Sequence, residues 1–348
     1  MTGSALAQSG TPAPIRLRVL GGLAGLPQYV QLEEPFWTNR IPEVTGGRVL
    51  ADIAPSDRSG IRAQDALRTI RLGVTPFGTV LLGSVAAEVP ELSGMELPGV
   101  APDLATLRRV VDATRPWIAD LLRERHGTEL LAVYTYAAQV VSCVRPFGDL
   151  SQLRGRRIRT SAPAQSEVVS AIGGIPVVIP FAEVVPAVRA GVVDCAVTGA
   201  MGGWQTGLAE LSSHIHPMAI TWGLALFGAN VNAWRSLPVD VRDTLRQEIE
   251  GLEARVWQAA DAEMVQGLAC TAGAPTCPPE LQVTPDGRRR PRGRVTLLAP
   301  TAADEALRRR VVEDVVLPRW AERCGAECAA TWHDRIGRDL GYRAPGGG

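Results

Sequence analysis

The 348-residue chain contains no lysine, so all 36 of its basic residues are arginine. A Walker-type phosphate loop, a Schiff-base enzyme and a pyridoxal-phosphate enzyme each need a lysine, so the sequence excludes these classes. Acidic residues also number 36. The resulting zero net charge gives no electrostatic reason to bind nucleic acid or an anionic membrane. The arginine cluster at 288–294 lies among Gly and Pro, which favours a solvated loop over a nucleic-acid patch.

Long hydrophobic runs and histidines are also scarce. The longest apolar run, residues 218–231, covers 14 positions and includes glycines and an asparagine. It is too short to span a bilayer, so it predicts a buried strand region. The four histidines form no Ser/His/Asp set with a recognisable nucleophile elbow. Residues 21–25 lack the G-x-G-x-x-G spacing, which argues against a dinucleotide site. We expect no cofactor.

The six cysteines form an even set, which fits an oxidising compartment. Cys270 and Cys277 bracket a loop that contains Gly and Pro, and a disulfide there stabilises the fold by about 2.5 kcal/mol in the loop-entropy model. Cys143 and Cys195 lie on two strand-like runs. They form either a further pair or two separate buried thiols.

Cys324 and Cys328 are the third candidate pair. A bridge between them needs a distorted helix end, which Gly325 permits. The alternative is a zinc site completed by His333 or by the histidines at 214 and 216, but these spacings match no familiar zinc tetrad. We expect no metal.

The first 14 residues are predicted to be disordered. Ser4–Gln8 has the small-residue pattern of a signal-peptidase site, although the charged and apolar regions that precede such a site are missing. Two interpretations remain open: the end of a signal peptide that begins upstream, or an ordinary disordered tail.

Strand and helix patterns alternate along the chain, which predicts an α/β protein with mostly parallel sheets. The pattern restarts after Gly127, so two α/β lobes with a ligand cleft between them are expected. The expected strands are 15–20, 48–53, 79–84, 129–134, 138–144 and 295–298, and the expected helices are 35–44, 63–72, 103–125, 238–264 and 302–324, the last with a kink or break at Pro318. The predicted divisions are lobe I at 15–136 with part of 219–237, lobe II at 137–218, a long bracing helix at 238–268, and a C-terminal loop, strand and helices at 269–348 that pack on the lobes.

Arg159 is the strongest single candidate for ligand binding. Strand alternation places Arg157, Arg159 and Ser161 on one face, and Arg159 is closer to the carboxyl end of the strand, where ligands of open α/β sheets collect. The fixed donors of an arginine match both oxygens of a carboxylate. The alternative is a surface arginine paired with a nearby carboxylate.

The elements around Arg159 resemble one family, the substrate-binding proteins of TRAP-type (tripartite ATP-independent periplasmic) transporters, DctP-like. The resemblance covers about residues 15–265. It rests on the combination Arg157-Ile158-Arg159-Thr160, Gly173-Gly174-Ile175-Pro176, Phe181-Ala182-Glu183-Val184 and Gly191-Val192-Val193-Asp194, with Thr45-Gly46-Gly47 and Trp234-Arg235-Ser236-Leu237-Pro238 as further matches.

The resemblance implies a role for several residues. Arg159 matches the arginine that contacts the substrate carboxylate in this family. Gln139 stands where some members have a second arginine, Thr198 where many have an asparagine, and Cys195 where glycine is usual. We expect Gln139 and Thr198 to supply polar contacts to the ligand.

Other residues are candidates for the wall of the pocket. Thr75 and Phe77 match a ligand-contacting loop of the family. Phe181, Trp204 and Trp222 lie near predicted strand ends, where they either wall a pocket or pack within the lobes.

The function that the resemblance implies is a monomeric periplasmic solute-binding protein. It would bind a small organic anion and deliver it to the membrane permease subunits of a TRAP transporter. Two alternatives remain: an α/β enzyme acting on a carboxylate substrate, for which the sequence offers no general base, and a ligand-sensing module.

Overall fold

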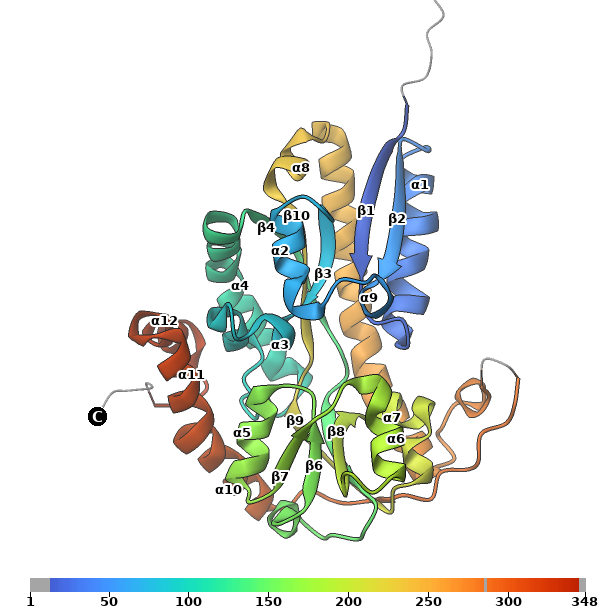
Figure 1. The fold of residues 1–348 in the computed structure, drawn as a ribbon, viewed down its shortest axis with the longest axis vertical. Helices are drawn as coiled ribbons and strands as arrows, with labels where there is room; N and C mark the ends of the chain where they lie inside the picture. Colours follow the sequence, from blue (N-terminus) through green and yellow to red (C-terminus); the bar gives the residue numbers. More distant parts are fainter. Residues whose placement is uncertain (1–12, 285–286, 344–348) are drawn as a thin grey trace, which may run out of the picture.

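The computed structural model describes residues 13–284 and 287–343, so the predicted processing site at Ser4–Gln8 lies outside the described residues. Two sheets form the framework (Figure 1). The first has the order β2-β1-β3-β10-β4. Its strands are β1 (Ile15–Gly21), β2 (Val49–Pro55), β3 (Phe77–Leu81), β10 (Leu224–Asn230) and β4 (Thr128–Thr135).

The second sheet has the order β11-β9-β5-β8-β6-β7. Its strands are β11 (Thr296–Leu297), β9 (His214–Thr221), β5 (Gln139–Cys143), β8 (Cys195–Gly199), β6 (Arg157–Thr160) and β7 (Ile175–Val178). The apolar run at 218–231 thus forms parts of two strands, one in each sheet.

Both sheets are mixed, so the expectation of mostly parallel pairing is wrong. Strand β10 pairs antiparallel with β3 and β4, and β5 pairs antiparallel with β8 and β9. The antiparallel pairs arise at two of the crossings between the sheets, from β4 to β5 and from β9 to β10. Each of these two crossings brings a strand into its new sheet against the direction of its neighbours, whereas the later crossing from β10 to β11 gives a parallel pair with β9.

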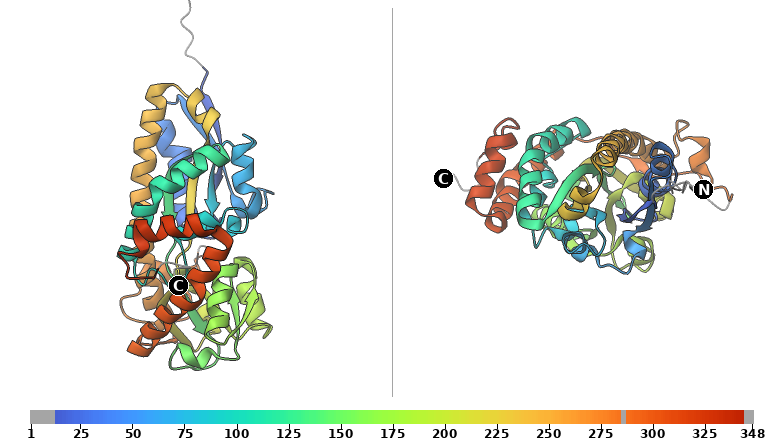
Figure 2. Two further views of the ribbon diagram at one scale, coloured as in Figure 1. Left: turned by 90° about the vertical axis from the view of Figure 1, so that its left-hand side faces the viewer. Right: turned by 90° about the horizontal axis from the view of Figure 1, so that it is seen from above.

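Helices cover both sheets (Figures 1 and 2). The long helix α4 begins after Asp103, whose side chain accepts a hydrogen bond from the Thr106 amide, and ends at Gly127 in the left-handed conformation. The helices are α1 (Ile41–Val44), α2 (Ala66–Arg71), α3 (Leu82–Val85), α4 (Leu104–His126), α5 (Pro163–Ala171), α6 (Val184–Arg189), α7 (Ala200–Thr206), α8 (Val231–Ser236), α9 (Val239–Ala272), α10 (Ala302–Val311), α11 (Leu317–Cys324) and α12 (Ala326–Trp332).

Helix α9 runs along both sheets (Figure 1). Against the first sheet, the indole of Trp257 donates a hydrogen bond to the Val133 carbonyl of β4 at 2.8 Å. Near its other end α9 packs on α7, where a Cβ at Gly267 would lie 2.3 Å from the backbone nitrogen of Met201. Only glycine allows the two helices to approach this closely.

The regular α-helix is interrupted just before Pro318, where the sequence indicated a kink or break. π-helical turns at Val312–Val316 join α10 to α11, and Pro318 lies in the first turn of α11. Trp320 and Trp332 donate hydrogen bonds to the carbonyls of Pro90 and Gly94. The C-terminal helices therefore hold the 3-10 turn at Pro90–Met95.

The disulfide predictions have a clear outcome. Cys270 and Cys277 are bonded, as expected from their loop. Cys143 and Cys195, which the sequence left open, are bonded between β5 and β8. The sulfurs of Cys324 and Cys328 lie together at the junction of α11 and α12. Across residues 13–284 and 287–343, no group of three or more His, Cys, Asp or Glu side chains is arranged to hold a metal ion.

None of the helices in the described part of the chain has the length and apolar character needed to cross a membrane.

Candidate ligand-binding site

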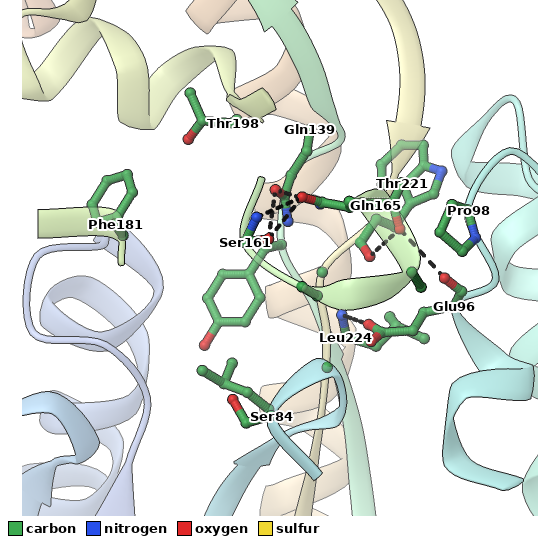
Figure 3. A pocket seen from close by; sticks show the side chains of 18 of the residues that line it. Ser84, Glu96, Pro98, Gln139, Ser161, Gln165, Phe181, Thr198, Thr221 and Leu224 are labelled. Carbon is green, nitrogen blue, oxygen red and sulfur yellow. Dashed lines mark hydrogen bonds between the residues drawn. The ribbon is translucent and has the colours of Figure 1, made fainter. Parts of the chain in front are cut away.

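A cavity of about 280 Å³ lies between the two sheets. Strands β5, β6 and β8 of the second sheet supply Gln139, Arg159 and Thr198 to its wall. The first sheet and the loops around it supply Glu96 and Leu224 (Figure 3). Trp222 and Glu263 of α9 also line the cavity. The polar groups converge from both sides of an otherwise apolar hollow, as in small-molecule sites.

Arg159 is buried, with 2% of its surface exposed, and no acidic side chain of residues 13–284 and 287–343 pairs with it. Its Nε donates to the carbonyl of Ile179 at 2.8 Å and its Nη1 donates to the carbonyl of Val197 at 2.7 Å. These bonds hold the guanidinium from the two neighbouring strands and leave Nη2 without a hydrogen bond to any described residue. Burial lowers the pKa of Arg159 to about 10, because the charged form is desolvated.

The neighbouring arginine behaves differently. Arg157 is exposed at the other end of β6 and forms a bidentate ion pair with Asp194, at 3.1 and 3.0 Å. Its hydrogen bonds hold the pKa of the Asp194 carboxyl below its usual range. The two arginines therefore differ by their position along β6, with Arg159 closer to the carboxyl end of the strand.

A cluster of three side chains lies beside Arg159. The Gln139 Oε1 accepts from the Gln165 Nε2 at 2.9 Å, and the Gln165 Oε1 accepts from the amide and hydroxyl of Ser161 at 2.8 and 3.0 Å (Figure 3). This arrangement fixes the amide of Gln139 with its Nε2 free to donate. The hydroxyl of Thr198 also makes no hydrogen bond to a described residue, and its side chain lines the same cavity.

Two predicted aromatic residues line the cavity. Trp222 is fixed by a hydrogen bond from its indole to the Ala101 carbonyl at 2.9 Å. Phe181 lies beside α7, where a Cβ at Gly202 would be 3.3 Å from its ring. Tyr136 also lines the cavity.

Three other predicted residues lie outside this cavity, and their placement in it is corrected. Phe77 is in the core of the first sheet, where its ring packs against Trp234. Thr75 lies in the turn that precedes β3. Trp204 is buried on the outer side of α7, where its indole donates to the Leu281 carbonyl. Neither the match to a loop of the family, for Thr75 and Phe77, nor proximity to a strand end, for Trp204, showed which way the side chain points.

The sequence reasoning missed two carboxylates in the cavity, Glu96 and Glu263. The Leu224 amide of β10 donates to the Glu96 Oε2 at 2.7 Å (Figure 3). Burial raises the pKa of Glu96 to about 8 and that of Glu263 to about 7. Glu96 lies in an irregular segment with no periodicity to assign its direction, and Glu263 is one of seven acidic residues on α9. Nothing in the local pattern singles them out.

The comparison with protein families decides the identity. The family model for bacterial extracellular solute-binding proteins, family 7 (DctP), matches residues 25–269. The chain belongs to this family. It is therefore a solute-binding protein and not an enzyme, and its resemblance to TRAP-type receptors is confirmed.

Similar solved structures share the fold. DctP7 of Bordetella pertussis, an extracytoplasmic solute receptor binding pyroglutamic acid, is 20% identical with a TM-score of 0.74, covering 92% of this chain and 98% of that one. A TRAP periplasmic solute-binding protein from Desulfovibrio salexigens with bound orotic acid is 18% identical with a TM-score of 0.76, covering 93% and 99%.

A curated relative is the ectoine-binding periplasmic protein TeaA of Halomonas elongata. It is 23% identical over 180 residues, which are 50% of this chain and 52% of TeaA. The match thus spans about half of the length of the curated relative.

Proposed function

We propose that this family member binds a small organic acid in the cavity between its lobes, with the ligand carboxylate on Arg159. The observation that carries the proposal is that this buried guanidinium has no acidic partner in the described part of the chain. A buried charge without a partner is costly, and a carboxylate that fills the remaining donors removes that cost.

The neighbouring polar groups extend the same site. The free Nε2 of Gln139 and the hydroxyl of Thr198 are suited to the second oxygen or a further acceptor of the ligand. Trp222 and Phe181 supply flat apolar surface for the ligand body. Exclusion of water would strengthen each of these contacts.

Closure of the lobes would supply that exclusion. We propose residues 15–136, with part of 219–237, as lobe I and residues 137–218 as lobe II. Two of the chain crossings, β4 to β5 and β9 to β10, would then serve as the hinge. The closed form, a monomer in the periplasm, would deliver the ligand to the membrane permease of a TRAP transporter. The ligands named for related structures, pyroglutamic acid and orotic acid, support an organic acid as the cargo.

The test is a binding titration of the full chain against pyroglutamate, orotate and succinate by calorimetry and thermal shift. Arg159→Ala is expected to weaken binding of any acid that binds the wild type, on the order of 100-fold, because it removes the charge partner of the ligand carboxylate. Arg157→Ala is the matched control, since it removes an exposed arginine of the same strand. Equal binding by wild type and Arg159→Ala would overturn the carboxylate contact. Delivery is tested separately by uptake in cells that contain or lack the permease.

A further inference from the structure

We propose that the ligand is a zwitterion, whose carboxylate lies on Arg159 and whose cationic nitrogen lies against Glu96, with Glu263 as a second carboxylate on the same side. This inference rests on the proposed function, and it adds the substrate class. Its basis is the distribution of charge around the cavity.

Glu96 is held with one carboxylate oxygen available. Its Oε2 accepts the Leu224 amide, and its backbone carbonyl accepts the Thr221 hydroxyl at 3.3 Å. Its Oε1 makes no hydrogen bond to a described residue and lies beside Gly83, where a Cβ would be 3.4 Å away. Gly83 lines the cavity too, so the free oxygen is on the cavity side of Glu96.

Glu263 has no hydrogen bond or ion pair with any described residue. It projects from α9 into the same cavity, and burial is the only cause of its raised pKa. A second carboxylate without a partner therefore faces the space that the ligand would fill.

The cavity has too few cations for these carboxylates. Arg323 also lines it but is paired with Glu167 of α5. Arg159 makes no ion pair with Glu96 or Glu263, so the cation of one wall and the carboxylates of the other are each left for a ligand. An anion would contact Arg159 and leave Glu96 and Glu263 without a cationic partner. A zwitterion supplies a partner to Arg159 and a partner to the carboxylates, and it adds no net charge.

The proposal predicts a pH dependence of ligand binding whose direction can be measured. Glu96 and Glu263 have pKa values of about 8 and about 7 in the empty cavity. The other titratable groups that face them are Arg159, the Arg323–Glu167 pair and Tyr136, whose pKa burial raises well above its usual value. A cationic nitrogen favours the ionised carboxylates, so its binding releases protons and tightens as the pH rises from about 6 to about 9. An anion favours the protonated carboxyl groups, so its binding takes up protons and weakens as the pH rises.

The experiment compares L-proline with L-pyroglutamate, using the full chain. The two probes share a five-membered ring and a carboxylate, but proline has a secondary ammonium where pyroglutamate has a lactam. Calorimetry in two buffers of different ionisation enthalpy measures affinity and proton exchange together. We expect proline to bind about tenfold or more tightly than pyroglutamate, with proton release.

Variants separate the two walls. Glu96→Gln keeps an oxygen for the Leu224 amide and removes the charge, so it is expected to weaken proline by about tenfold and to leave pyroglutamate within about threefold. Glu263→Gln is a second variant, at a side chain that makes no hydrogen bond or ion pair with any described residue. Glu88→Gln, exposed and near Glu96 in sequence, is the matched control and should change neither probe.

The outcomes distinguish this inference from the proposed function. Binding of pyroglutamate that depends on Arg159, with no binding of proline, would overturn the zwitterion and leave the organic-acid site standing. Proline binding that Glu96→Gln and Glu263→Gln leave unchanged would also overturn it. If Arg159→Ala binds both probes as the wild type does, the proposed function fails, and the zwitterion fails with it.

Discussion

The two walls of the cavity differ in how their charged groups are held. On the side of the second sheet, Arg159, Gln139 and Thr198 are strand residues, so ladder hydrogen bonds set their positions. On the other side, Glu96 follows the 3-10 turn at Pro90–Met95, which Trp320 and Trp332 hold by hydrogen bonds.

This difference assigns a role to the C-terminal region. Residues after 300 contribute little to the sheets, but α11 and α12 position a carboxylate that lies more than 200 positions earlier in the chain. The cationic wall, which consists of Arg159, Gln139 and Thr198, is complete within the second sheet. In the acidic wall, which consists of Glu96 and Glu263, the position of Glu96 depends on the packing of distant helices. Each wall is left with charge that the protein itself does not neutralise.

The largest expected effect tests the stiffness of the cationic wall. The Cys143–Cys195 bond joins β5 to β8 and so fixes the register that sets Gln139 opposite Gly199 and Val140 opposite Thr198. Replacing both cysteines with alanine should lower the free energy of unfolding by about 4 kcal/mol, since the bond closes a loop with a sequence separation of 52.

The matched control is the Cys270–Cys277 bond, which closes a loop with a separation of only 7. Its double alanine variant should lose about 2.5 kcal/mol. Urea unfolding of both variants measures the difference. If replacing Cys143 and Cys195 lowers the free energy of unfolding no more than replacing Cys270 and Cys277, the bond between β5 and β8 does not stiffen the wall as proposed.

The second prediction concerns the helix that joins the walls. Helix α9 carries Glu263, and four residues later Gly267 packs against the start of α7, where Met201 lines the cavity. Gly267→Ala places a methyl group 2.3 Å from the Met201 backbone nitrogen, so the helices must separate. We expect a loss of about 1–3 kcal/mol in unfolding free energy.

Gly251→Ala is the control on the same helix. Its Cβ would meet only the Arg255 guanidinium at 3.5 Å, and alanine is the better helix former, so we expect a gain of up to about 1 kcal/mol. Thermal unfolding of the two variants checks the contrast. Similar shifts in both would show that the contact between α9 and α7 does not constrain the walls.

The sequence predicted those features that depend on local pattern. Strand direction favoured Arg159 over Arg157 for the cavity, and loop length paired Cys270 with Cys277. The long helix began where Leu237-Pro238 indicated. In each case the cause lies within a few residues of its effect.

Features that depend on distant contacts were missed. The bond between Cys143 and Cys195 follows from the register of two strands about fifty residues apart. Mixed pairing follows from two of the crossings between sheets. Trp204 was expected in the pocket, but the loop at 278–282 covers it on the other side of α7. The direction of Glu96 depends on tryptophans near the end of the chain.

The smallest expected effect is the pH dependence of the empty protein. Glu96 and Glu263 have raised pKa values of about 8 and about 7 in the folded state, so the folded protein holds protons that the unfolded chain has lost. The stabilisation is therefore complete at low pH and is lost as the pH rises through the folded values. From about pH 7 to about pH 9, the free energy of unfolding should fall by about 1–2 kcal/mol.

Burial also raises the pKa of Glu33, so variants are needed to assign the fall to Glu96 and Glu263. Burial lowers the pKa of His216, and Arg157 lowers that of Asp194, so both change charge at lower pH. In urea unfolding, the double variant Glu96→Gln/Glu263→Gln should lose most of the fall in unfolding free energy between about pH 7 and about pH 9. The exposed Glu88→Gln variant should show the same fall as the wild type. If the unfolding free energy of the double variant falls as steeply with pH as that of the wild type, the two carboxylates are not the uncompensated groups of this cavity. The difference in charge between its two walls is then contradicted.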